Sequence, residues 1–149
     1  LQREGKGVDD EPVGRMFMTM EGSAVFRWAA ITLPKALAAT LDRAGVNTSD
    51  IDVFIPHQAN GRINELLTKG LGLNPETVVA QDIQDAGNTS AASIPLALWQ
   101  AIRRKQVQPP ATLCLVGFGG GLTWGAAIVK WTAKDKREEI RSEGSGSEN

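Results

Sequence analysis

The sequence predicts an α/β fold, because segments with the apolar spacing of helices alternate with short runs of apolar and branched residues. The expected order is helix, strand, helix, strand, helix, strand, strand, and a glycine-rich stretch between the last two strands favours a hairpin. With 149 residues, of which 42 % are hydrophobic, the chain can bury a core without disulfides. These three observations indicate one layered α/β unit.

The clearest helical pattern covers residues 22–44. Apolar residues recur there at spacings of three and four, as at Leu33 and Leu37. Gly45 follows as a C-terminal stop, and Pro34 inside the pattern predicts a kink. The segment is therefore expected to be a long helix that packs one face on the core.

Two shorter helices are expected over residues 60–70 and 90–104. The first has Ile63 and Leu67 on one face, and the second begins with very small residues before its apolar positions appear. Residues 85–88 lie between them and combine Asp, Gly and Asn, which are typical of a loop.

Four segments have the short, branched and apolar character of strands. They cover residues 51–55, 78–80, 113–116 and 122–131. The glycine-rich residues 117–121 are expected to form a tight turn between the last two. No apolar run approaches the roughly 18 residues of a membrane span.

The two ends of the chain differ from its middle. Residues 1–15 are rich in glycine and charge and are expected to be a loop or a truncated upstream segment. Residues 133–149 are expected to be a flexible charged Gly/Ser tail. The foldable part is therefore expected over residues 16–132. The chain does not begin with Met, which hints at a missing upstream part, and residues 1–10 lack the apolar stretch of a signal peptide.

Composition excludes several classes of function. A single cysteine, Cys114, allows neither an internal disulfide nor a multi-cysteine zinc site, and a single histidine, His57, excludes metal motifs with two histidines. The formal net charge is −1, so the chain lacks the basic excess of a bulk nucleic-acid binder. Nothing in the sequence indicates a metal site.

Three polar or glycine-rich loops each follow an expected strand, where sites gather in α/β sheets. They are PHQAN (residues 56–60), GNTS (87–90) and GFGGG (117–121). His57 fits either a structural role or proton handling and hydrogen-bond donation near neutral pH. Asn88 fits either ordinary turn chemistry or an amide donor aimed at developing negative charge.

The chain offers no convincing nucleophile. Cys114 lies between Leu113 and Leu115 in an apolar strand, which favours a buried structural thiol. Ser90 and Ser93 are not surrounded by the GxSxG pattern of a nucleophile elbow. The glycine run lacks the spacing of a dinucleotide loop and is followed by a strand, so it favours a tight turn whose backbone can approach a ligand.

Together these loops resemble β-ketoacyl-acyl-carrier-protein synthase III, the initiating condensing enzyme of type II fatty acid synthesis. The motifs PHQAN (56–60), GNTSAAS (87–93) and FGGGLTWG (118–125) fit in order and separation, and the resemblance runs from about residue 16 to residue 131. It covers the C-terminal half of that family only. The implied fold is the C-terminal half of a thiolase-like αβαβα layered fold, in an enzyme that is normally a cytoplasmic homodimer.

The resemblance also implies roles for individual residues. His57 and Asn88 match the histidine and asparagine of the family's Cys-His-Asn triad, whose nucleophilic cysteine lies in the N-terminal half. They would hydrogen-bond the malonyl thioester oxygen after decarboxylation and so stabilise the enolate. Gly120 matches the backbone oxyanion donor for the acyl thioester.

Other positions match the binding surfaces of the family. Gly22, Phe26, Ala59 and Asn60 match the channel for the pantetheine arm of coenzyme A, although Ser23 stands where some members have Asn. The basic residues Arg62, Arg27 and Lys69 match the surface that meets acidic acyl carrier protein, while a solvated helix face is the plainer explanation for Lys69. Arg62 and Lys69 are seven residues apart and share a helix face.

Three hypotheses remain open at this stage. The chain is part of a synthase III that joins acyl-CoA to malonyl-acyl-carrier protein, part of a polyketide starter-unit synthase, or a non-catalytic thiolase-like half that binds coenzyme A, carrier protein or a partner half. No cofactor beyond these substrates is expected, and neither nucleic acid nor membrane is an expected partner. Isolated from its other half, the chain is expected to be inactive.

Overall fold

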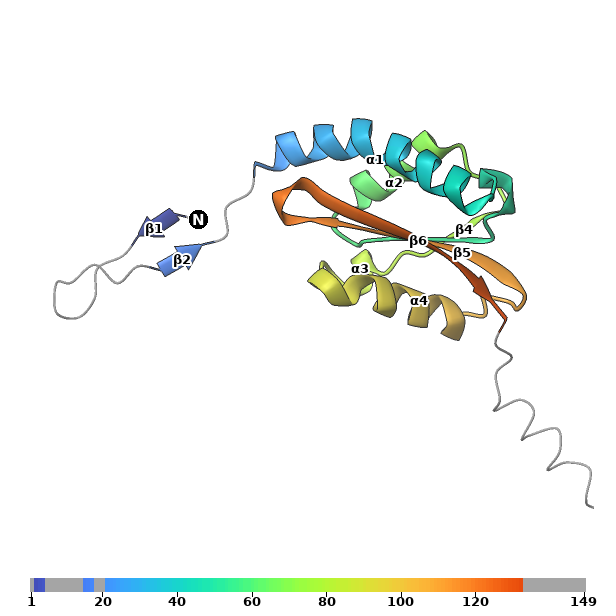
Figure 1. Ribbon diagram of the computed structural model, residues 1–149. Helices are drawn as coiled ribbons and strands as arrows, with labels where there is room; N and C mark the ends of the chain where they lie inside the picture. Colours follow the sequence, from blue (N-terminus) through green and yellow to red (C-terminus); the bar gives the residue numbers. More distant parts are fainter. Residues whose placement is uncertain (1, 5–14, 18–20, 133–149) are drawn as a thin grey trace, which may run out of the picture.

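The computed structural model describes residues 2–4, 15–17 and 21–132. Its main body is a four-stranded sheet in the order β4-β3-β5-β6 with helices on both faces (Figure 1). Strands β4 (Val78–Val79), β3 (Val53–Pro56) and β5 (Ala111–Gly119) are parallel, and β6 (Thr123–Trp131) is antiparallel to β5. The predicted α/β class and the predicted hairpin are therefore confirmed.

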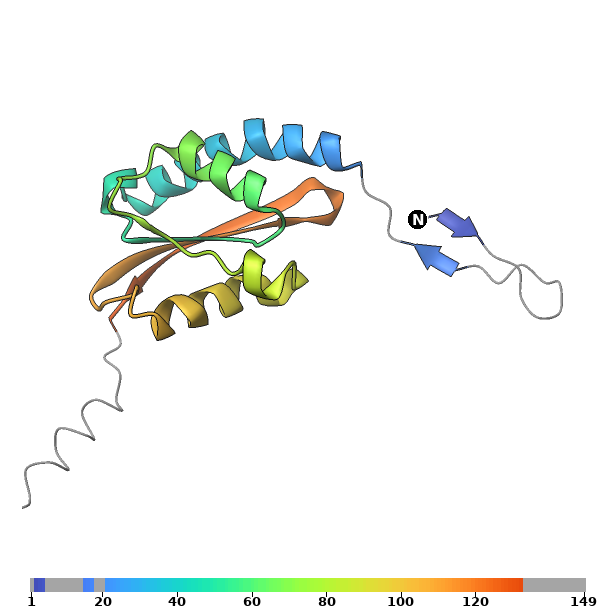
Figure 2. The ribbon, with the colours of Figure 1, turned by 180° about the vertical axis from the view of Figure 1, so that it is seen from behind.

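Helices α1 (Gly22–Ala44) and α2 (Gly61–Leu71) cover one face of the sheet. Helices α3 (Ile83–Ala86) and α4 (Ser93–Arg103) cover the opposite face, as the reverse view in Figure 2 also shows. The central strands β3 and β5 are largely buried, because their apolar residues point alternately to the two helical layers. The edge strand β6 has no buried residue.

The alternation along β3 divides the core into two clusters. Phe54 faces α1 and α2 and joins Cys114 and Val116 of β5 in the first cluster. Val53 and Ile55 face the other way and join Leu113 and the small residues of α4 in the second. Cys114 is fully buried, as its apolar neighbours predicted.

Helix α1 buries one stripe of residues at a spacing of four: Ala29, Leu33, Leu37 and Leu41. The helix ends at Gly45, whose left-handed backbone (φ 63°, ψ 34°) favours a residue without a Cβ. This confirms the predicted bounds and the predicted stop. The helix is continuous through Pro34. Two ring carbons of Pro34 lie 3.0 and 3.5 Å from a Cβ built at Gly70 of α2, so the two helices approach closely there.

Several predicted segments change their bounds. The strands expected over 51–55 and 78–80 lie at Val53–Pro56 and Val78–Val79, and the helix expected over 60–70 lies at Gly61–Leu71. The strand expected over 113–116 extends to Ala111–Gly119, because its backbone pairing with β6 continues through Gly117 and Gly119 and needs no side chains. The turn expected over 117–121 therefore shortens to the 3₁₀ helix η3 (Gly120–Leu122). The helix expected over 90–104 divides into the 3₁₀ helix η2 (Ser90–Ala92), whose first residue has a positive φ (54°), and α4.

The prediction of a loop over residues 85–88 was wrong in part, because α3 occupies Ile83–Ala86. The side chain of Gln58 accepts hydrogen bonds from the backbone N–H groups of Asp82 and Ile83 at 3.1 and 3.2 Å. N–H groups at a helix start have no partner within the helix. Local sequence could not reveal this helix because its cap comes from a distant loop.

Residues 1–15 were expected to be a loop or a truncated upstream segment, and the loop alternative does not hold for residues 2–4 and 15, which lie in strands. Strands β1 (Gln2–Glu4) and β2 (Arg15–Phe17) form a short antiparallel pair. Pairing of three residues on each side depends on backbone hydrogen bonds, which leave no apolar pattern in so short a segment. Residues 5–14 and the tail predicted over 133–149 lie outside the described residues. In the part of the chain that the structure describes, no helix is long and apolar enough to cross a membrane.

Candidate active site

The three loops that the sequence singled out lie at one edge of the sheet. Because β3, β4 and β5 are parallel, their carboxyl ends point the same way. Residues 57–60 follow β3, residues 80–92 follow β4, and the turn of the β5–β6 hairpin follows β5. The fold therefore brings the loops of His57, Asn88 and Gly120 to the same side of the molecule.

His57 is held by three contacts. Its backbone N–H donates to the carbonyl of Val116 at 2.7 Å, which holds the residue against β5. Its ring lies against Phe118 in a T-shaped arrangement, with centroids 5.2 Å apart and planes at 76°. On the other side, Nδ1 lies 2.5 Å from Oγ of Ser93, the first residue of α4.

These contacts leave the imidazole half-buried, and burial lowers the pKa of His57 below its ordinary value of 6.5. The ring is therefore neutral at neutral pH. A neutral imidazole carries one N–H donor and one acceptor nitrogen. Within the described residues, Nε2 makes no hydrogen bond, so that nitrogen is the one available to a ligand.

Asn88 is exposed in the loop between α3 and η2. Its Oδ1 accepts a hydrogen bond from the backbone N–H of Ser90 at 2.9 Å, which orients the side-chain amide. No hydrogen bond from its Nδ2 occurs among the residues that the structure describes. The turn role and the donor role considered from the sequence are thus compatible, since they use different atoms of one amide.

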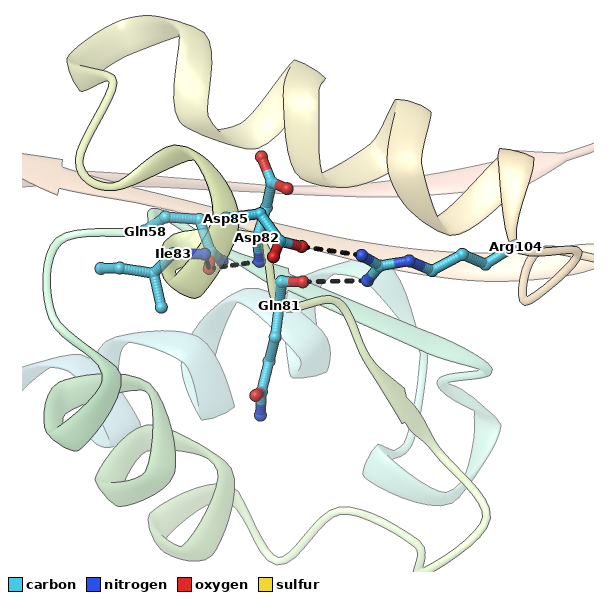
Figure 3. Close-up of polar contacts among 6 residues, drawn as sticks. All are labelled: Gln58, Gln81, Asp82, Ile83, Asp85 and Arg104. Atoms are coloured by element: carbon cyan, nitrogen blue, oxygen red, sulfur yellow. Dashed lines mark hydrogen bonds and ion pairs between the residues drawn. The ribbon is translucent and has the colours of Figure 1, made fainter.

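Gln58 joins the loop after β3 to the loop after β4 (Figure 3). Its side chain is buried, and its Nε2 donates to the carbonyls of Pro56 at 2.7 Å and Ala80 at 3.2 Å. Its Oε1 accepts the two N–H groups that begin α3. All four hydrogen-bonding positions of the amide are used, so the loops of His57 and Asn88 are fixed relative to each other.

Arg104 makes further contacts with the segment that begins α3. Arg104, which follows α4, pairs with Asp85 of α3 at 2.9 Å and donates to the carbonyl of Gln81 at 3.3 Å. Figure 3 shows this pair beside Asp82. Both side chains are exposed, so the pair contributes little to stability. Its effect is to hold α3 against the end of α4.

Gly120 opens the hairpin turn and is exposed. A Cβ added at Gly119 or Gly120 would meet nothing within 4 Å, whereas Gly121 has a positive φ of 74° that favours glycine for the turn itself. The backbone at Gly120 is therefore open on its outer side. Its role as an oxyanion donor stays a prediction.

The four residues predicted to line a channel fall at the beginnings of α1 and α2. Gly22 and Phe26 are one turn apart in α1, and the Phe26 side chain is 36 % exposed. Asn60 caps α2 by accepting the N–H of Arg62 at 2.9 Å, and Ala59 precedes it. Asn60 thus has a structural role whatever else it contacts.

The three predicted carrier-docking residues are all exposed: Arg62 and Lys69 on α2 and Arg27 on α1. Arg62 and Lys69 share a face of α2, as their spacing predicted. The single ion pair found within the described residues joins Arg104 to Asp85, so these three cations have no carboxylate partner there.

Sequence reasoning missed the partners of His57. Ser93 and Phe118 belong to the quoted motifs, but only the tertiary structure shows that both touch the imidazole. Alternation along β5 could have placed Phe118 on the face of Cys114 and Val116. Among the described residues, no group of three or more His, Cys, Asp and Glu side chains could hold a metal ion.

The chain has a mixed sheet with helices on both faces and polar loops at the carboxyl ends of its parallel strands, and its likeness to solved structures places it in the thiolase-like α/β class. Solved structures share this fold. The 3-oxoacyl-(acyl carrier protein) synthase III of Pseudomonas aeruginosa PAO1 is 39 % identical with a TM-score of 0.74. The match covers 78 % of this chain and 37 % of the Pseudomonas chain. A priming β-ketosynthase of a polyketide biosynthetic pathway is 38 % identical with a TM-score of 0.78. This match covers 84 % of this chain and 37 % of the β-ketosynthase chain.

The chain matches the family model of the 3-oxoacyl-[acyl-carrier-protein (ACP)] synthase III C-terminal region over residues 41–131. It belongs to this family. The mycobacterial β-ketoacyl-[acyl-carrier-protein] synthase III of Mycobacterium ulcerans is 52 % identical over 122 residues, which are 81 % of this chain and 36 % of that protein. The corresponding protein of Mycobacterium tuberculosis is 50 % identical over 116 residues, which are 78 % of this chain and 35 % of that protein. The chain thus spans about a third of the length of these relatives.

Proposed function

We propose that this chain is the C-terminal part of a 3-oxoacyl-acyl-carrier-protein synthase III, an acyltransferase that initiates fatty acid synthesis. The whole enzyme would condense an acyl-CoA starter with malonyl-acyl-carrier protein in the cytoplasm. The observation that carries the proposal is the neutral, oriented imidazole of His57 on a loop fixed to that of Asn88.

The proposed reaction has two halves. A cysteine outside this chain takes the acyl group from acyl-CoA as a thioester and releases coenzyme A. Malonyl-acyl-carrier protein then loses CO2, and the electron pair of the broken bond forms an enolate at the thioester. The enolate carbon attacks the acyl thioester, the new carbon–carbon bond forms, and the cysteine thiolate leaves.

His57 and Asn88 act on the second half. Nε2–H of His57 and Nδ2–H of Asn88 donate hydrogen bonds to the thioester oxygen as negative charge develops there. Burial lowers the pKa of His57, which supports this assignment, because a neutral imidazole carries one N–H that can donate a hydrogen bond. The backbone N–H of Gly120 donates to the oxygen of the acyl thioester when the enolate attacks.

The substrates would approach along α1 and α2. Gly22, Phe26, Ala59 and Asn60 line the channel for the pantetheine arm, which suits the exposed ring of Phe26. Arg62, Arg27 and Lys69 meet acidic residues of the acyl carrier protein. A local patch is sufficient for such docking, so the net charge of −1 is no obstacle.

The remaining part of the enzyme would cover α4, and two such enzymes would form a homodimer. Trp99 and Ile102 on α4 are 49 % and 37 % exposed, and large apolar side chains on one helix indicate a surface that is covered in the whole protein. The cysteine nucleophile would come from this other part.

A polyketide starter-unit synthase is the second candidate, and the structural likeness to a priming β-ketosynthase favours it. A non-catalytic half that only binds coenzyme A, carrier protein or a partner half is the third. The length of the source reading frame and the intact mass of the native protein separate the third from the others. A native reading frame that starts at Leu1 would exclude the fragment hypothesis.

The proposal is tested in the whole enzyme with His57→Ala and Asn88→Ala. Each variant should slow malonyl decarboxylation by about 100- to 1,000-fold, the loss typical of removing one oxyanion donor. Acylation of the cysteine, followed by intact mass with acyl-CoA alone, should change far less. Gln84→Ala, which removes an exposed amide from α3, is the matched control and should leave both steps unchanged. Equal losses in both steps would contradict the assigned roles.

A further inference from the structure

The buried hydroxyl of Ser93 has two neighbours from the loop of His57. Oγ accepts a hydrogen bond from the backbone N–H of Gln58 at 3.2 Å and lies 2.5 Å from Nδ1 of His57. Ser93 is 1 % exposed, so water does not substitute for these partners. The hydrogen-bonding capacity of this hydroxyl must therefore be met by the protein.

Counting donors and acceptors decides which ring nitrogen carries the proton. A serine hydroxyl has one hydrogen to donate and two lone pairs to accept with. Gln58 N–H occupies one lone pair, and within the described residues Nδ1 of His57 is the acceptor placed to receive the hydroxyl hydrogen. If Nδ1 carried a proton instead, the hydroxyl hydrogen would be buried without a partner, which is costly.

We propose that Ser93 is a positioning residue: its hydroxyl donates to Nδ1 of His57 and so holds the ring proton on Nε2. The T-shaped contact with Phe118 fixes the plane of the same ring, so the Nε2–H bond has a set direction. Ser93 acts through His57 and touches no substrate.

The consequence for chemistry rests on the proposed function. A developing enolate oxygen is stabilised by an N–H and repelled by a nitrogen lone pair. Ser93 therefore decides whether His57 meets that oxygen as a donor or as an acceptor. Ser93, the second serine of the GNTSAAS motif, would be required for its hydroxyl rather than as a nucleophile.

The sole histidine of the chain makes the proton position directly measurable. Long-range 1H–15N correlation spectra of the 15N-labelled 149-residue chain, recorded above the pKa of His57, report one imidazole. Nε2 should appear as the protonated nitrogen and Nδ1 as the unprotonated one. A proton on Nδ1 overturns the proposal without any variant.

Variants then test the cause. Ser93→Ala should lower the ratio of the Nε2-protonated to the Nδ1-protonated form of His57 by about 2- to 10-fold. This is the effect expected from the loss of one ordinary hydrogen bond. Ser93→Cys keeps the size and weakens the donor, and gives the same comparison if Ser93→Ala does not fold. Ser49→Ala removes an exposed serine at the amino end of β3 and is the control. An unchanged proton position in a folded Ser93 variant overturns the proposal.

Kinetics of the whole enzyme complete the test. The folded Ser93 variant should lower kcat of malonyl decarboxylation by about 2- to 10-fold, with little change in KM and in cysteine acylation. Wild-type rates in that variant overturn the role of Ser93. Failure of the wild-type enzyme to decarboxylate malonyl-acyl-carrier protein overturns the proposed function instead, and the spectra still decide where the proton lies.

Discussion

At the scale of single residues, the surroundings of His57 link the site to the stability of the chain. The imidazole is half-buried against Phe118 and Ser93, and burial disfavours its charged form. The same surroundings that keep the ring neutral for hydrogen-bond donation therefore make its protonation unfavourable in the folded state.

This predicts how stability changes with pH. The pKa of His57 is lower in the folded chain than its unfolded value near 6.5, so between the two values the unfolded chain binds more protons. The free energy of unfolding should fall as pH drops below 6.5 and should not depend on His57 above it. Urea unfolding at about pH 7.5 and about pH 5.5 measures the drop. A His57→Gln chain should lose less over this interval, and an equal loss would contradict the prediction.

The burial of Cys114 could be predicted from its neighbours in the sequence. Its apolar neighbours predicted a buried structural thiol, and the structure confirms it: the side chain is fully buried, and burial raises its pKa to about 11. The partners of His57 could not be predicted in this way, because Ser93 is 36 residues distant and meets the ring only after the sheet forms.

At the scale of elements, α2 carries a glycine at each end, and the two have different functions. Gly72 follows the helix in the left-handed conformation (φ 58°, ψ 43°), where a Cβ is unfavourable. Gly61 is the first helical residue, its φ is not positive, and a Cβ there would meet nothing within 4 Å. The pair gives a matched comparison within one helix.

Gly72→Ala should lower the free energy of unfolding by about 1–2 kcal/mol, because the left-handed conformation is strained for alanine. Gly61→Ala should raise it by up to about 0.5–1 kcal/mol, because alanine has less backbone freedom to lose on folding. Urea unfolding of the 149-residue chain measures both changes. Equal effects of the two substitutions would show that backbone conformation at Gly72 does not control the end of α2.

The elements that sequence reasoning missed share a cause. The first backbone N–H groups of helix α3 donate to the side chain of Gln58. Strand β5 extends beyond its apolar run because β6 pairs with it. In both cases the stabilising partner is distant along the chain. Helix α1, by contrast, carries its own apolar stripe and its own C-terminal glycine, and its predicted bounds were confirmed.

At the scale of the whole molecule, the chain spans about a third of its relatives, and its one cysteine cannot serve as the nucleophile. Cys114 lies in the core with a raised pKa, so it is neither accessible nor ionised at neutral pH. The chain therefore holds the groups proposed to stabilise the enolate without a group to carry the acyl chain.

The purified 149-residue chain should accordingly be inactive alone. Incubated with acetyl-CoA, it should gain no acyl mass, and with malonyl-acyl-carrier protein added it should release no 3-oxoacyl product. The whole enzyme, assayed in parallel, provides the positive control. Condensation by the isolated chain would contradict both the inactivity and the placement of the nucleophile outside it.

The sequence by itself determined the α/β class, the order of the main elements, the family and the positions of His57, Asn88 and Gly120, because each of these is written in local periodicity or in a short motif. Only the tertiary structure decided how these residues are supported. The amide of Gln58, the hydroxyl of Ser93 and the ring of Phe118 come from different elements and meet at the edge where the parallel strands end. Which nitrogen of His57 donates depends on that convergence, because hydrogen bonds and burial are properties of neighbours in space.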